Sequence, residues 1–346
     1  MKKIPSRNIS FDILNVLSCF AVICLHCNND VYNVANTTAW KFSLLVQCLT
    51  MWCVPVFFML TGAKLINYRS KYSTKLFFKK RITKTLIPLL FWSTIHLFRK
   101  LYLNKLEVTA ISSLIGCYTT GNIEGTYWFF YSLFGIYLAI PILSALVSKN
   151  EIAILWYIFI LSILYNTLFP ILNYFFNFQI NSSILGNFSG YIGYAILGYL
   201  ITTSDIFKRK KYIFYILGIT GAITMWIGTY YINIIIPQTN SLNKLFMTFS
   251  SINNYFMAIA IFIFVSSINY ENLNLQIRSI ILKLSSASFG IYLIHMLLIY
   301  IINDCIVTLN TASIYYKTVG VIVLYTISFF IVTLIKRISI IKHIVP

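Results

Sequence analysis

The chain has 346 residues, of which 59% are hydrophobic and only 10% are charged, and its mean hydropathy is +0.79. Soluble globular domains carry about 25% charged residues, so this composition excludes a soluble fold and predicts one integral membrane domain over residues 1–346. The net charge of +19 does not indicate nucleic-acid binding, because the basic residues form short clusters between apolar stretches, as the positive-inside rule predicts.

The first apolar stretch, at about residues 9–27, is long enough to cross a bilayer, which takes about 20 residues. It nevertheless contains Asp12, Asn15, Cys19 and His26. At ~100° per residue, all of these fall within about 60° of Asp12 on a helix and form one polar stripe. Ionisable groups that face lipid are costly, so the stripe predicts one wall of a polar cavity inside a helical bundle. A signal peptide is the alternative, but further spans follow and no small-residue cleavage site does.

Further apolar stretches follow, which together predict an all-α, polytopic fold of about ten transmembrane helices. The predicted spans are 9–27, 42–66, 86–103, 127–147, 152–170, 188–203, 212–232, 250–268, 284–303 and 315–335. We expect Pro88 to lie where the third span begins, Pro170 to end the fifth, and residues 104–126 to form an outer loop. With both termini in the cytoplasm, the inner segments hold 21 of the 27 Lys and Arg residues, which favours this topology.

Histidines within the spans are candidates for proton transfer. His26 lies ~17 residues into the first span, in the outer half of the membrane. An imidazole accepts a proton near neutral pH, which suits a general base acting on a hydroxyl; a packing histidine between helices is the open alternative. His295 lies near mid-membrane with Tyr292 one turn before it, either as a second wall of the cavity or as a packing residue. We expect a structural role for His96 and no role for His343 on the cytoplasmic tail.

Two carboxylates are further candidates, one at each side of the membrane. Asp12 lies near the cytoplasmic face, where it pairs with a cation of segment 79–84 or orients Asn15. Glu124 lies at the outer mouth, three residues before Tyr127, where it either assists His26 or is a solvated loop carboxylate. Both alternatives are open for each residue.

The segment FFKKRITKTLIP carries Lys80, Arg81 and Lys84 where the chain re-enters the membrane. Arg81 and Lys84 are three residues apart, so on an α-helix they share one face. Two cations on one face at the cytoplasmic surface suit the phosphates of a nucleotide-like cofactor. The alternative is positive-inside charge that attracts anionic lipid. Cys24, His26 and Cys27 lie close together, but no second ligand pair with zinc-site spacing follows, so no metal site is predicted.

Four stretches in this order resemble the acyltransferase-3 family, integral-membrane acyltransferases that modify bacterial surface sugars. They are FDILNVLSCFAVICLHC, VPVFFMLTGAKL, FFKKRITKTLIPLLFW, and YWFFYSLFGIYLAIPIL together with SFGIYLIH. The resemblance implies that an acyl group, commonly acetyl, passes from cytoplasmic acyl-CoA to a sugar hydroxyl at the outer face. His26 matches the catalytic histidine of that family, and Arg81 the first arginine of its R-x-x-R cofactor motif. The chain departs from the pattern at Asn15 and Lys84, where the family has arginine, and lysine lacks the bidentate fork of arginine.

The resemblance therefore predicts an O-acyltransferase, specifically an O-acetyltransferase, in the bacterial cytoplasmic (inner) membrane. Its partners are acetyl-CoA or another acyl-CoA as donor, membrane lipids, and a lipid-linked or nascent surface polysaccharide such as O-antigen as acceptor. The implied donor site comprises Arg81, Lys84, Lys80, Asn15 and Asp12, and the implied catalytic site His26 with Glu124 and His295. A polysaccharide polymerase, a flippase or another glycolipid transporter is the alternative, but the outer loops are short and no paired broken helices appear.

Overall fold

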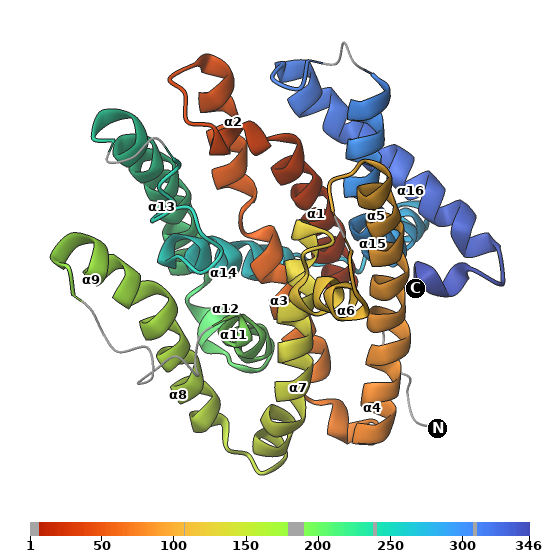
Figure 1. The fold of residues 1–346 in the computed structure, drawn as a ribbon. Coiled ribbons are helices and arrows are strands. Elements are labelled where there is room, and N and C mark those ends of the chain that lie inside the picture. The colour runs from red at the N-terminus through yellow and green to blue at the C-terminus, as the bar shows by residue number, and fades with distance from the viewer. Residues whose placement is uncertain (1–6, 107, 179–189, 238–240, 307–309) are drawn as a thin grey trace.

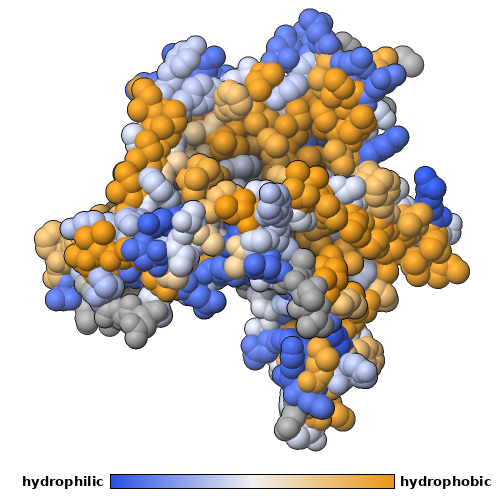
Figure 2. Space-filling view, turned by 90° about the horizontal axis from the view of Figure 1, so that it is seen from above, coloured by the Kyte–Doolittle hydropathy of each residue, from blue (hydrophilic) through white to orange (hydrophobic). Residues whose placement is uncertain are grey.

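The computed structural model describes residues 7–106, 108–178, 190–237, 241–306 and 310–346. These residues form helices and no strand, which confirms the all-α fold (Figure 1). Within them, seven helical runs are long and apolar enough to cross a membrane. Figure 2 shows apolar side chains over large areas of the face seen from above. Apolar surface of this extent is expected where a protein contacts lipid, so the chain is a multi-pass membrane protein.

The helices, in chain order, are α1 (Ile9–Cys27), α2 (Thr38–Thr50), α3 (Cys53–Leu65), α4 (Thr74–Arg81), α5 (Ile87–Tyr102), α6 (Ile111–Thr120), α7 (Trp128–Ser148), α8 (Ile152–Ile163), α9 (Phe169–Phe176), α11 (Ile192–Thr203), α12 (Ile206–Arg209), α13 (Lys211–Tyr230), α14 (Ile252–Ser267), α15 (Leu275–Cys305) and α16 (Val321–Arg337). A helix lies at each of the ten predicted spans. The count of ten crossings, the cytoplasmic termini and the single domain over 1–346 stay predictions.

The centre of the bundle is built from α1, α3, α11 and α15. Helix α1 packs against α3 and α15, and α3 packs along α11. Glycines make the contact between α3 and α11 possible. A Cβ added at Gly62 on α3 would lie 1.7 Å from the carbonyl oxygen of Ala195 on α11. A Cβ added at Gly198 on α11 would lie 2.0 Å from the carbonyl oxygen of Met59 on α3. Small residues of this kind let two membrane helices approach backbone to backbone. The position of α3 is therefore fixed by α11.

Two prolines are preceded by a π-helical turn instead of a helix end. The turn Ile82–Leu86 (η3) joins α4 to α5 ahead of Pro88, and Leu164–Leu168 (η5) joins α8 to α9 ahead of Pro170. Proline lacks an N–H and clashes with the carbonyl four residues earlier, and a wider turn relieves that clash. The predicted end of the fifth span at Pro170 is therefore wrong, since the helical run continues to Phe176.

A short helix, α6, lies in the segment predicted to be an outer loop. It packs on α5 through a small apolar cluster of Leu97, Cys117 and Ile123, and the hydroxyl of Tyr131 on α7 donates to the carbonyl of Tyr118. A ten-residue helix without a long apolar face gives little periodic signal, which explains why the sequence did not predict it. The consequence is that α6 covers the end of α5 near Glu124.

Candidate functional site

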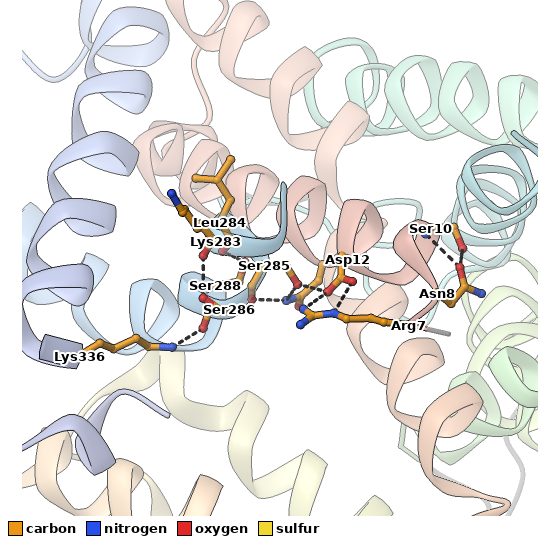
Figure 3. Close-up of polar contacts among 11 residues, drawn as sticks. Arg7, Asn8, Ser10, Asp12, Lys283, Leu284, Ser285, Ser286, Ser288 and Lys336 are labelled. Atoms are coloured by element: carbon orange, nitrogen blue, oxygen red, sulfur yellow. Dashed lines mark hydrogen bonds and ion pairs between the residues drawn. The ribbon is translucent and has the colours of Figure 1, made fainter. Parts of the chain in front are cut away.

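The polar stripe of α1 faces α15. The Asp12 carboxylate pairs with Arg7 at 2.6 and 2.8 Å and accepts a 2.7 Å hydrogen bond from the Ser285 hydroxyl (Figure 3). Asn15 donates to the carbonyl and hydroxyl oxygens of Ser285 at 2.9 and 3.2 Å. One turn further, the Cys19 thiol donates to the carbonyl of Ser288 at 3.4 Å. The expected pairing of Asp12 with segment 79–84 is wrong, because Arg7, next to α1 itself, takes that place.

A cavity of about 180 Å³ opens between α1, α3, α4, α7 and α15. Its polar lining consists of Asn15, Thr61, Lys64, Arg81, Tyr137, Ser288 and Tyr292, and the rest is aromatic or aliphatic. The cavity thus joins a cationic end to an aromatic end inside the bundle. Apolar clefts with a few convergent polar groups are the usual form of small-molecule sites.

Arg81 is the cation of the predicted basic segment that reaches this cavity. Its guanidinium lies over the rings of Tyr137 and Phe77, at 5.4 and 5.8 Å from their centroids. Its buried Nε has no hydrogen-bond partner among the described residues. A half-buried guanidinium with an unused donor is suited to an anionic ligand.

The other two predicted cations of this segment, Lys84 and Lys80, do not line the cavity. Lys84 is exposed on the π-helical turn and does not line the cavity, because the wider turn separates it from the face of Arg81. The side chain of Lys80 lies over the ring of Tyr72, 4.2 Å from its centroid. The expectation that Arg81 and Lys84 share one helix face is therefore wrong, since the segment between them is not α-helical.

Lys64 is the cation that sequence reasoning missed. It lines the same cavity as Arg81, at the end of α3, and its ammonium lies 5.7 Å from the centroid of the Phe11 ring. A signal for it exists in the sequence, because Phe57, Leu60, Thr61 and Lys64 recur at the i, i+3, i+4, i+7 spacing of one helix face. All of these residues line the cavity.

His26 and His295 meet between α1 and α15, with ring centroids 5.1 Å apart and an angle of 41° between the planes. His295 is fully buried, and its Nδ1 lies 2.6 Å from the carbonyl oxygen of Tyr292. A carbonyl only accepts, so Nδ1 carries the hydrogen and the Nε2 of the neutral ring keeps a free lone pair. That Nε2 has no hydrogen-bond partner among the described residues. The structure therefore brings two predicted residues together around an available proton acceptor.

Tyr292 connects the imidazole pair to the cavity. Its ring lines the cavity, and its centroid lies 5.4 Å from that of His295. Phe57 and Phe129 pack against Tyr292 at 6.5 and 5.2 Å. The described residues that line the cavity include neither histidine, and Tyr292 is the lining residue whose ring lies next to His295.

Glu124 is buried, with only 2% of its side chain exposed, so the alternative of a solvated loop carboxylate is wrong. One carboxylate oxygen accepts from the backbone N–H and the hydroxyl of Thr126 at 3.1 and 2.9 Å. The other lies 3.4 Å from Nδ1 of His96, which is itself 1% exposed. The partner of Glu124 is thus His96 and not His26, and His96 belongs to a buried polar pair that the sequence did not predict.

Among the described residues, no group of three or more His, Cys, Asp or Glu side chains lies close enough to hold a metal ion. The seven cysteines are free thiols.

A comparison with protein-family models matches residues 8–337 to the family described as the acyltransferase domain. No curated protein matches the chain, and neither does any solved structure. The match covers every residue of the cavity, the imidazole pair and the His96–Glu124 pair.

Proposed function

The chain belongs to the acyltransferase-domain family, and from this premise we propose that it is an O-acyltransferase that moves an acetyl group from cytoplasmic acetyl-CoA to a sugar hydroxyl. Membership of the family and the seven apolar helical runs make it a membrane acyltransferase. The donor, the acceptor and the residues that act are the content of the proposal.

The cavity is the proposed donor site. Arg81 and Lys64 line its cationic end, where they suit the phosphates of acyl-CoA, and Asn15 lies on the same wall. Lys80 and Lys84 belong to the same basic segment but do not line the cavity, so they contribute only general positive charge to the surface near Arg81. Asp12 acts indirectly, because its bond to Ser285 holds the part of α15 on which Asn15 is also anchored. The thioester then lies toward Tyr292 at the aromatic end.

The proposed chemistry takes place at the imidazole pair. His26 accepts the proton of the acceptor hydroxyl while its oxygen attacks the thioester carbonyl. The tetrahedral intermediate then collapses, the C–S bond breaks, and the proton passes to the thiolate, which leaves as CoA. His295, with its hydrogen fixed on Nδ1, places a second acceptor nitrogen beside His26. Tyr292 and the rings packed on it must shift for the thioester to reach the imidazoles, and Glu124 is a further candidate for positioning the reacting groups.

The acceptor follows from the resemblance of the four ordered segments to acyltransferases of surface sugars. We therefore propose a lipid-linked or nascent surface polysaccharide as acceptor and the bacterial cytoplasmic (inner) membrane as location. The observation that supports transfer most directly is the cavity that extends from Arg81 and Lys64 to Tyr292, next to the two imidazoles.

The test is His26→Ala in membranes supplied with labelled acetyl-CoA. We expect incorporation of label to fall by about 10²-fold or more, which is the usual contribution of a positioned general base. His343→Ala is the control, since His343 lies exposed near the C-terminus. Acetyl-CoA should also raise the thermal stability of the unmodified protein. Normal transfer by His26→Ala would remove His26 from this role.

A further inference from the structure

The His96–Glu124 pair is a second set of buried titratable groups outside the imidazole pair. His96 faces Glu124 through Nδ1, which lies 3.4 Å from a carboxylate oxygen, and both side chains are at most 2% exposed. The Nε2 of His96 is buried and has no hydrogen-bond partner among the described residues. Buried polar atoms are nearly always hydrogen-bonded, and an unpaired one requires an explanation, such as a catalytic role or an ordered water.

Two hydrogen bonds join the segment that follows Glu124 to the part of α15 that carries His295. The segment that follows Glu124 donates from the hydroxyl of Tyr127 to the carbonyl of Leu293 at 2.7 Å. In return, the hydroxyl of Tyr292 donates to the carbonyl of Thr126 at 2.9 Å. The bonds hold the segment that carries Glu124 against the same turn of α15 that carries His295.

Proton transfer at His26 and His295 creates a charge that the surroundings must compensate. Both rings lie between helices inside the bundle, and the uptake of a proton there forms an imidazolium in a medium of low dielectric. The other imidazole of the pair offers no negative charge. The carboxylate of Glu124 can supply that negative charge. His96 lies on one side of this carboxylate and Thr126 on the other, and together they hold it in place.

We propose that His96 and Glu124 form a positioning dyad of the acyl transfer. Glu124 stabilises the imidazolium at the His26–His295 pair between removal of the hydroxyl proton and its delivery to the CoA thiolate, and His96 keeps the carboxylate oriented. No atom of the dyad joins the bonds that change, in which a C–O ester bond forms and a C–S bond breaks. This inference rests on the proposed function. It adds His96 on α5 and Glu124 on the segment before α7 as positioning residues.

Glu124→Gln is the decisive variant, because glutamine keeps an oxygen to accept from Thr126 but carries no charge. We expect the maximal rate of label transfer from acetyl-CoA to fall by about 10- to 100-fold, with the KM for acetyl-CoA and the thermal midpoint unchanged. Glu124→Asp, which restores the charge, should recover part of the rate. The double variant with His96→Gln should be no slower than the slower single variant, because residues that act as one unit are not additive.

The matched control is Asp304→Asn, which breaks the exposed 2.5 Å ion pair between Arg99 and Asp304, since Arg99 lies about one turn after His96 on α5. It should leave the rate unchanged. Full activity of folded Glu124→Gln, or of His96→Gln should Glu124→Gln fail to fold, overturns the inference. So does a double variant whose loss is the product of the two single losses. Absence of transfer by the unmodified protein instead contradicts the proposed function, so the two failures are distinguishable.

Discussion

The contact between α3 and α11 holds one wall of the cavity that we propose as the donor site, and Gly198→Ala tests this contact. A Cβ at this position would lie 2.0 Å from the carbonyl oxygen of Met59 and 2.5 Å from its carbonyl and α carbons. These are backbone atoms, so no side-chain rotation relieves the clash and the two helices must move apart by roughly 1 Å. Overpacking of this kind costs about 1–3 kcal/mol. At ~2–4 °C per kcal/mol, the thermal midpoint should fall by about 2–12 °C.

The assay is thermal unfolding of the purified protein in detergent, followed by tryptophan fluorescence with and without acetyl-CoA. Gly135→Ala on α7 is the matched control, because a Cβ there meets nothing within 4 Å. Alanine in that helix should be neutral or stabilising by up to about 1 kcal/mol. Since α3 carries Thr61 and Lys64 of the cavity wall, Gly198→Ala should also reduce the stabilisation by acetyl-CoA. Equal midpoints for the two variants would refute the close contact of α3 and α11.

Three further outcomes follow from the site. Arg81→Ala should raise the KM for acetyl-CoA about tenfold, since a charged hydrogen bond contributes about 1.5–3 kcal/mol; Lys84→Ala, on the exposed side of the same segment, should leave it within about threefold. An equal rise in KM for Arg81→Ala and Lys84→Ala would show that the positive charge of the segment, and not a specific contact of Arg81, attracts acetyl-CoA. Asp12→Asn should lower the free energy of unfolding by only about 1 kcal/mol, because its partner Arg7 is 57% exposed and solvent screens the pair; a larger loss in urea titrations would show a buried network. His295→Gln should slow transfer about 10²-fold yet keep the stabilisation by acetyl-CoA, because this ring does not line the cavity; loss of that stabilisation would assign His295 to donor binding.

The membrane fold and the polar face of α1 could be predicted from the order and spacing of residues in the sequence alone. Hydropathy predicted the all-α membrane fold, and a helix lies at each of the ten predicted spans. The ~100° rotation per residue placed the polar atoms of Asp12 and Asn15 on one stripe, and in the structure both bond to Ser285. The same spacing is present at Phe57, Leu60, Thr61 and Lys64, which line the cavity, although no cavity face was predicted there from the sequence. A side chain on a regular helix has a direction that follows from its position number, so such predictions hold.

Contacts between helices depended on the tertiary structure. The π-helical turn ahead of Pro88 removed Lys84 from the face of Arg81, and regular periodicity does not predict such a turn. Lys64 reaches the same cavity from another helix, more than a dozen residues earlier in the chain. Glu124 and His96 meet only because the segment before α7 is bonded to α15 and covered by α6. A carboxylate in a loop has no periodicity to reveal what it faces, so its burial and its histidine partner are decided by how distant segments pack.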